Sequence, residues 1–355
     1  MIENDKDLRL IVSLFNIEGE ITMIKPYGEG LINSTLLVTT TKRRYILQRI
    51  NTNVFKQPNE LMNNICAVTE YLHARGVETL EVVHTKAGDP FLSGEICYRL
   101  YVFIEDTVTY QKVPDTKTFY NCGKAFGEFQ NQLSSFDASV LTETILNFHN
   151  TPTRFEAFKK ALEADVCGRA AECKQEIDFV LKHADTYYKA VEGLRDGSLP
   201  LRVTHNDTKI NNILMDNKTN VGRAIIDLDT VMPGAMMYDF GDSIRSGANT
   251  AAEDEPDLDK VHLDFSLFKA YAEGFCSAVK ESITKKEKEL LAYGAYLMTV
   301  ECGIRFLTDY LSGDTYFKIK YPTHNIVRTR AQLRLASEIE ENLDKMNEVV
   351  FNACK

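Results

Sequence analysis

Two short polar stretches constrain the fold of this chain more than any other feature. The first reads HNDTKINN over residues 205–212, and the second reads IDLD over residues 226–229. An apolar run follows the first stretch, another leads into the second, and the turn-rich DNKTN separates them. Apolar runs joined by such a turn are typical of a β-hairpin. The hairpin would bring the two polar stretches to one place, although they lie on opposite sides of it in the sequence.

The side chains that meet there suit phosphoryl transfer. An attacking hydroxyl must lose its proton, and Asp207 offers a carboxylate as general base. Asn212 can give its amide oxygen and Asp227 its carboxylate to Mg²⁺. His205 is expected to hold the loop backbone and to take no part in the chemistry. We therefore predict a kinase that uses ATP and Mg²⁺; the alternative is an Asx-rich turn with an ordinary hairpin and solvated carboxylates.

These stretches resemble the aminoglycoside phosphotransferase and choline kinase superfamily, whose motif is H-x-D-x-x-x-x-N followed by I-D-x-D. More narrowly, HNDTKINN, IDLDTVMPG, DFGDSIR, RFLTDYLSGD and NFHNTPTR resemble segments of bacterial N-acetylhexosamine 1-kinases. The resemblance covers nearly the whole chain. It implies an α+β, bilobal, protein-kinase-like fold, with a small N-terminal α/β lobe containing an antiparallel sheet and a larger, mostly helical C-terminal lobe.

The hydrophobic pattern agrees with two lobes. A chain of 355 residues exceeds the usual size of a single core. Strand-like alternation prevails up to CYRLYVFIED, and helical spacing prevails from Thr116 onward. We place the lobes at residues 1–105 and 106–355, and expect helices at 8–15, 59–76, 176–194, 285–311 and 325–350 and strands at 21–24 and 44–50.

The N-terminal lobe carries the expected nucleotide contacts. In YGEGLINST, Gly28 and Gly30 followed by Asn33 and Thr35 predict a tight turn whose backbone amides cover the phosphates. A hairpin turn without a ligand would look the same. The resemblance places the adenine-binding hinge at residues 103–105, with contacts from the backbone of Phe103 and Glu105.

One strand departs from the family pattern. RYILQRI occupies the strand where a kinase usually carries a phosphate-binding lysine, and the matching positions hold Gln48 and Arg49. Neighbouring strand residues face opposite sides, so both reach the cleft only if the strand is bulged. Register favours Gln48 and charge favours Arg49, and both stay candidates. The missing lysine also leaves open a nucleotide-binding pseudokinase that acts as a regulatory module.

Several polar residues are candidates for the acceptor side. Lys209 is expected to touch the γ-phosphate, although a solvated lysine is the alternative. Asp229 is a candidate second metal ligand, loop cap or substrate contact. Asp239 and Asp242 are expected to order the catalytic loop or to bind sugar hydroxyls, and Arg245 is expected to pair with one of them. Arg305 has two interpretations, a sugar contact or an ion pair with Asp309 four residues later. Weaker candidates are His149, Asp314 and Tyr316.

The expected acceptor is the anomeric hydroxyl of an N-acetylhexosamine, by resemblance. The alternative is another small alcohol, such as an amino alcohol or an aminoglycoside, and an acidic pocket would favour it. A net charge of −10 argues against a nucleic-acid partner. No stretch was expected to span a membrane, and the N-terminus lacks the pattern of a signal peptide. We expect a cytoplasmic enzyme; the sequence makes no prediction of oligomeric state.

Overall fold

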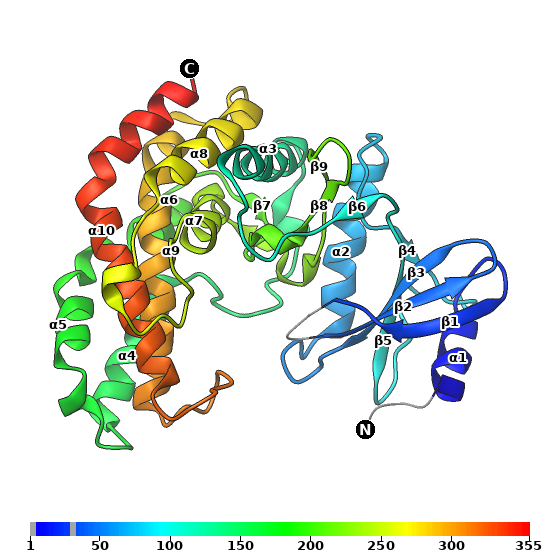
Figure 1. Cartoon of the computed structure of the whole chain (residues 1–355), viewed down its shortest axis with the longest axis horizontal. Helices are drawn as coiled ribbons and strands as arrows, with labels where there is room; N and C mark the ends of the chain where they lie inside the picture. Colours follow the sequence, from blue (N-terminus) through cyan, green and yellow to red (C-terminus); the bar gives the residue numbers. More distant parts are fainter. Residues whose placement is uncertain (1–4, 29–32) are drawn as a thin grey trace.

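An antiparallel sheet forms most of the N-terminal lobe in the computed structural model, which describes residues 5–28 and 33–355. Its strands lie in the order β1-β2-β3-β5-β4, at one end of the molecule (Figure 1). Both strands predicted for this lobe are confirmed. Their bounds are β1 Ile21–Pro26, β2 Ser34–Thr40, β3 Arg44–Ile50, β4 Val82–Val83 and β5 Cys97–Val102.

The two faces of this sheet have different neighbours. Helix α1 (Asp5–Ser13) packs Val12 against one face, in a cluster that includes Tyr45 and Leu47 of β3. Because side chains alternate along a strand, Arg49 falls on that same face and Gln48 on the opposite one. The β3 register runs unbroken against both neighbouring strands. The bulge that would turn both side chains into the cleft is therefore absent from β3.

The chain leaves the first sheet after Val102 and enters a second one at once. There β6 (Thr107–Val108), β8 (Ile213–Asp216) and β9 (Gly222–Ile225) form three antiparallel strands in the order β6-β8-β9. The predicted hairpin is thus confirmed as β8 and β9. Strand β7 (Arg202–Thr204), directly before the HNDTKINN loop, pairs with β10 (Met232–Gly234), which follows the IDLD stretch, in a two-stranded sheet.

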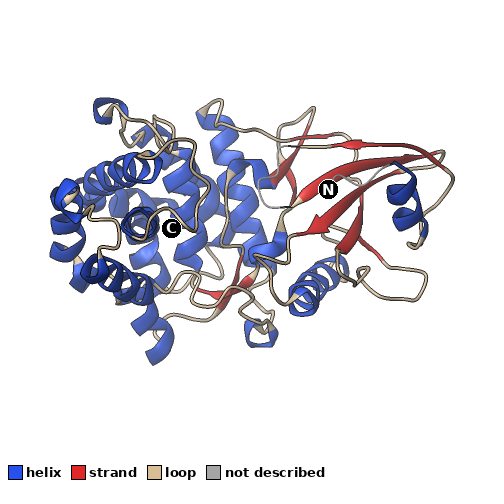
Figure 2. Ribbon diagram, turned by 90° about the horizontal axis from the view of Figure 1, so that it is seen from below, coloured by secondary structure: helices blue, strands red, loops and turns tan. Residues whose placement is uncertain are grey.

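Helices make up most of the rest of the chain (Figure 2). The long helices predicted at 285–311 and 325–350 are confirmed. Their bounds are α2 Pro58–His73, α3 Thr116–Gln132, α4 Thr151–Ala164, α5 Lys174–Lys182, α6 Lys189–Asp196, α7 Met236–Gly247, α8 Phe265–Val279, α9 Lys285–Leu311 and α10 His324–Ala353. Short 3-10 turns are at Ala138–Val140, Ala170–Glu172, Ala184–Thr186, Ile210–Asn212, Leu228–Thr230 and Leu258–Lys260.

The helical stretch predicted at 176–194 is confirmed, but it is not one continuous helix. The chain forms α5 and α6, separated by a 3-10 turn. At this break, two side chains donate hydrogen bonds to backbone carbonyl oxygens. The Thr186 hydroxyl donates to His183 O (2.7 Å), and the buried Tyr187 hydroxyl donates to Val180 O (2.9 Å). These bonds compete with continuous helical bonding, which explains the interruption.

Helix α9 is the centre of the helical lobe and packs against α4, α7 and α10. It begins with a capping box, in which Thr284 and Glu287 bond each other's backbone amides. By length and a hydropathy of 1.3 it could cross a membrane, whereas the sequence analysis expected no such stretch. Because 89% of that window is buried, packing within the lobe accounts for its apolar character.

Glycines let several helices cross with their backbones in contact. A Cβ built on Gly274 of α8 would lie 2.0 Å from Tyr120 O of α3, and one on Gly123 of α3 would lie 2.3 Å from Tyr271 O of α8. Gly241 of α7 faces Gly294 of α9 in the same way, at 2.2 Å. The crossings leave no room for a side chain, so they fix the spacing of the helices that carry the site.

This spacing can be tested with Gly274→Ala. The added methyl group would press on backbone and not on a flexible side chain, so we expect a loss of about 1–3 kcal/mol in the free energy of unfolding, measured in urea. Gly94→Ala is the control, because its Cβ would meet Ile96 O at an ordinary 3.5 Å. Equal stability of the two variants would contradict the close crossing.

Candidate active site

One buried carboxylate, that of Asp239, holds the backbone of the HNDTKINN loop. Asp239, near the start of α7, accepts hydrogen bonds from the backbone amides of His205 (2.9 Å) and Asn206 (2.8 Å). Gln130 of α3 donates to the same carboxylate at 2.6 Å. Burial raises the pKa of Asp239, and these donors oppose the shift. Asn206 has φ +64°, so the carboxylate stabilises a turn in the left-handed region.

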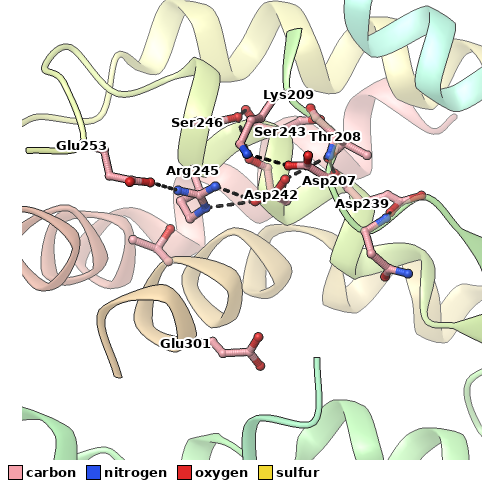
Figure 3. Close-up of polar contacts among 12 residues, drawn as sticks. Asp207, Thr208, Lys209, Asp239, Asp242, Ser243, Arg245, Ser246, Glu253 and Glu301 are labelled. Atoms are coloured by element: carbon pink, nitrogen blue, oxygen red, sulfur yellow. Dashed lines mark hydrogen bonds and ion pairs between the residues drawn. The ribbon is translucent and has the colours of Figure 1, made fainter. Parts of the chain in front are cut away.

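A second carboxylate of α7 holds the next part of the loop. Asp242 accepts from the Thr208 amide at 2.9 Å and from two guanidinium nitrogens of Arg245, which also contacts Glu253 at 3.1 Å (Figure 3). Arg245 therefore pairs with Asp242, one of its two predicted partners. Burial alone would raise the pKa of Asp242, but Arg245 and Lys209 outweigh it and hold that pKa below the ordinary value.

His205 joins the two motif stretches. Its Nδ1 accepts from the Asp207 amide (3.2 Å), so its Nε2 carries the hydrogen that is donated to Ile226 O (2.9 Å). The Ile226 amide in turn donates to Asn212 O (2.9 Å). His205 is fully buried. The prediction that it is a structural residue is confirmed, and the second stretch is bonded to the first through both backbone groups of Ile226.

Asp207 lies at the surface of this scaffold. Lys209 Nζ is 2.7 Å from its Oδ1, and Asn212 Nδ2 donates to its backbone oxygen (2.8 Å) and to Oδ2 (3.3 Å). The carboxylate of Asp207 raises the pKa of Lys209, which therefore stays charged. About a quarter of the Asp207 side chain, 27%, is exposed. A substrate hydroxyl can thus approach a carboxylate whose position is fixed by two neighbours.

Asp227 differs from the other carboxylates of the site. It lies in the left-handed region (φ +59°), is exposed, and has no hydrogen bond or ion pair within residues 5–28 and 33–355. Reduced hydration, followed by the charges of Asp229 and Asp207, raises the pKa of Asp227 to about 6. Clustered negative charge and unpaired oxygen ligands fit Mg²⁺. Among the described residues, no group of three or more His, Cys, Asp or Glu is placed to hold a metal ion.

Asp229 is bonded to the N-terminal lobe. Asn33 donates to its Oδ2 at 2.5 Å, and Arg99 Nη1 of β5 is 2.5 Å from its Oδ1. Arg99 is not among the residues predicted from the sequence, because CYRLYV alternates like ordinary sheet core. The available signal was a single arginine inside an apolar alternating strand. Asp229 is a candidate metal ligand, loop cap or substrate contact by sequence, and each of its carboxylate oxygens has a partner in the N-terminal lobe.

The other nucleotide candidates lie along the same lobe. Gly28 has φ +73°, and Gly30 lies outside the described residues. Thr35 accepts from Gln48 Nε2 at 3.1 Å. At the predicted hinge, the ring of Phe103 lies under the Arg44 guanidinium at 4.1 Å, and Glu105 pairs with Arg44. The hinge is thus held beside the first sheet by one arginine of β3.

Arg305 is not paired with Asp309, so that expected ion pair is wrong. The Asp309 carboxylate instead accepts from the backbone amides of residues 315–317 (2.8 to 2.9 Å) and from Asn325 (2.8 Å). Arg305 lies between the rings of Phe148 and Phe317, at 5.4 and 5.5 Å. No carboxylate is within ion-pair distance of it in the described chain, so its donors are free for a ligand.

A buried acid connects this arginine with the catalytic loop. Glu301, one helical turn before Arg305, is bonded by His149 Nδ1 (2.8 Å) and Thr151 Oγ1 (2.6 Å). Burial disfavours its charge, but His149, Thr151 and Arg305 hold the pKa of Glu301 below its ordinary range. His149 Nε2 lies 3.3 Å from Asn206 O, next to Asp207. Arg305 and Glu301 are therefore linked through His149 to the loop that carries Asp207.

Comparison with known proteins agrees with this geometry. The phosphotransferase enzyme family matches residues 23–273. The fold is similar to that of a microcompartment-associated aminopropanol kinase (13% identity, TM-score 0.60, covering 97% of this chain and 99% of that one). It is also similar to spectinomycin phosphotransferase in complex with ADP and spectinomycin (14%, 0.61, 97% and 100%) and to choline kinase from Cryptosporidium parvum (13%, 0.61, 98% and 99%). The predicted bilobal, protein-kinase-like fold is confirmed.

The position of Asp207 leads to the first catalytic prediction. Asp207→Asn keeps the shape but removes the base, so turnover should fall by about 10² to 10⁴ while the KM for ATP stays within a few-fold. Steady-state kinetics measure both. Asp178→Asn, an exposed change on α5, is the control. A loss below tenfold would remove Asp207 from the base role.

Asp227 leads to a prediction about pH. Its native pKa is about 6 and its ordinary value is 3.8, so folding favours the protonated form and the ionised form costs stability as pH rises through this window. Asp227→Asn cannot ionise. Without nucleotide or metal, it should raise Tm by about 2 °C above pH 6 and leave Tm unchanged below pH 4. A difference that does not vary with pH would contradict the shift.

Proposed function

The chain belongs to the phosphotransferase enzyme family, and we propose that it transfers the γ-phosphoryl group of ATP to the anomeric hydroxyl of GlcNAc or GalNAc, giving the sugar 1-phosphate. Mg²⁺ is the proposed metal, held by Asn212 and Asp227. The N-terminal sheet, the turn at Gly28 and the hinge at residues 103–105 are the proposed nucleotide contacts. The proposed place of action is the cytoplasm, where ATP is available.

The catalytic loop supports the transfer step. Asp207 accepts the proton of the sugar hydroxyl as that oxygen attacks the phosphorus in line with the leaving ADP. Lys209, beside Asp207, adds positive charge where the transferred oxygens carry negative charge. Mg²⁺, when bound with the nucleotide, supplies charge neutralisation on the phosphates. His205, Asp239 and the loop backbone keep Asp207 in place and do not touch the reactants.

The charge of the acceptor side is the observation that carries the choice of acceptor. Three of its carboxylates already have partners: Asp242 and Glu253 pair with Arg245, and Glu301 bonds His149. A cationic acceptor binds best to a carboxylate that has no other partner. The arrangement therefore supports a neutral acceptor more than an amino alcohol or an aminoglycoside.

Arg305 offers hydrogen-bond donors to a neutral acceptor. Its guanidinium is positioned by two aromatic rings and keeps its hydrogen-bond donors available. A planar donor fork suits a carbonyl oxygen, such as that of an N-acetyl group, and it repels an ammonium group. Arg154 adds a second cation close to it, since Arg305 helps to lower the pKa of Arg154 after burial. Both arginines favour an acceptor with exposed oxygen atoms.

The runner-up is a kinase of amino alcohols or aminoglycosides. Its support is the comparison, because the similar solved structures are named as kinases of aminopropanol, choline and spectinomycin. At 13 to 14% identity these structures share the fold with this chain.

An ADP-release assay with MgATP and a panel of acceptors tests the proposal. We expect turnover with GlcNAc or GalNAc, with kcat/KM at least about 10²-fold above that for glucose, since glucose would leave buried polar partners unpaired. Phosphorus NMR of the product should show coupling to the anomeric proton. A 6-phosphate product, or turnover only with ethanolamine, choline or aminopropanol, would reject the hexosamine 1-kinase proposal.

Variants of Arg305 serve as the matched control in that assay. Arg305→Leu should raise the KM for the N-acetyl sugar about tenfold or more and leave the KM for ATP unchanged. Arg75→Leu should change neither, although Arg75 also lies over an aromatic ring, that of Tyr71 at 3.4 Å. An unchanged sugar KM in Arg305→Leu would remove this arginine from the acceptor contact.

A further inference from the structure

The strand that should carry a phosphate-binding lysine has none, yet the cleft face of the sheet holds a buried cation. Arg99 is paired with Gln48 across β5 and β3, and it is 1% exposed. A charge buried to this extent is costly unless its partners are well placed. Ordinary sheet packing therefore does not explain why an arginine is buried at this position.

Its partners form one polar row across three strands. Gln48 Oε1 accepts from Arg99 Nε (3.0 Å) and Nη2 (2.8 Å), and Gln48 Nε2 donates to Thr35 (3.1 Å). Thr35 and Gln48 are cross-strand neighbours, as are Gln48 and Arg99. The glutamine in the lysine slot thus fixes the direction of the guanidinium on the neighbouring strand.

The remaining nitrogen of Arg99 points across the lobes. Its Nη1 lies 2.5 Å from Asp229 Oδ1, and Asp229 follows Asp227 by two residues. The other oxygen of Asp229 accepts from Asn33, at the start of β2. Asp229 therefore has a sheet contact on each oxygen, and the loop that carries Asp227 is attached to the N-terminal lobe.

We propose that Arg99 is a positioning residue, which acts through Asp229 to set the place of Asp227 and so the capacity of the site to bind Mg²⁺ with a nucleotide. In this role it replaces the missing β3 lysine by a contact to the metal-binding loop and not to the phosphates. The proposal rests on the nucleotide half of the proposed function and is independent of the acceptor.

Calorimetry of ADP binding, in EDTA and in excess MgCl₂, separates these roles. In Arg99→Gln the gain in affinity that Mg²⁺ confers should fall about tenfold or more, while the Kd for ADP in EDTA stays within about threefold. Arg99→Lys keeps a charge and should lose less of the gain. Arg43→Gln is the control, because it removes an exposed arginine of the same lobe, paired with Glu18.

The coupling to Asp229 has its own test. Asp229→Asn should reduce the Mg²⁺ gain as Arg99→Gln does, and the double variant should be no worse than either single one, because the two residues act as one unit. Thermal unfolding verifies that each variant is folded. If Arg99→Gln does not fold, Arg99→Lys takes its place in the binding measurements.

Three results would overturn the proposal. Equal weakening of ADP in EDTA and in MgCl₂ would mean that Arg99 contacts the phosphates directly. An unchanged Mg²⁺ gain in Arg99→Gln and Arg99→Lys would mean that it does not position the metal-binding loop. Failure of ADP to bind the parent protein would reject the proposed function as well, whereas failure of the sugar assay alone would leave the role of Arg99 intact.

Discussion

The site depends on the buried carboxylate of Asp239, which has no cationic side chain as a partner in the described chain. It is stabilised by hydrogen bonds from the amides of His205 and Asn206 and from Gln130. These donors come from the catalytic loop and from α3, while the acceptor comes from α7. An unpaired buried acceptor would be costly, so the three elements keep their relative positions. The catalytic loop can then hold a turn with φ +64° at Asn206. The residues that are bonded to this loop are positioned by it in turn.

The aspartates of the site fall into two groups by the partners that they have. Asp239, Asp242 and Asp229 are bonded to the backbone or to arginines, and they hold segments together. Asp207 and Asp227 are accessible, with few or no bonds to their carboxylates. The proposed chemistry falls to the second group, because a carboxylate must have a free lone pair to take a proton or a metal. The division also explains why the sequence, which shows five similar aspartates, does not reveal their separate roles.

Local features were predictable from the sequence, and long-range ones were not. The β8–β9 hairpin, strand β3 and helix α9 follow from turns and from periodicity, which neighbouring residues determine. Alternation on β3 showed that only one of Gln48 and Arg49 faces the cleft, but the choice depended on α1, which packs on the other face. Arg99 was missed because its partner is 130 positions away in another lobe. The Arg305–Asp309 pair failed for a related reason, since amides of a later loop compete for the Asp309 carboxylate.

The way in which Asp309 holds the following loop has a consequence for engineering. The carboxylate bonds the backbone amides of residues 315–317 and no side chain of that segment. The path of the loop is therefore nearly independent of which side chains it carries. Tyr316 is 68% exposed at its tip, next to Phe317, which stacks on Arg305. Substitutions at positions 315 and 316 should therefore reshape the surface beside Arg305 at little cost in stability.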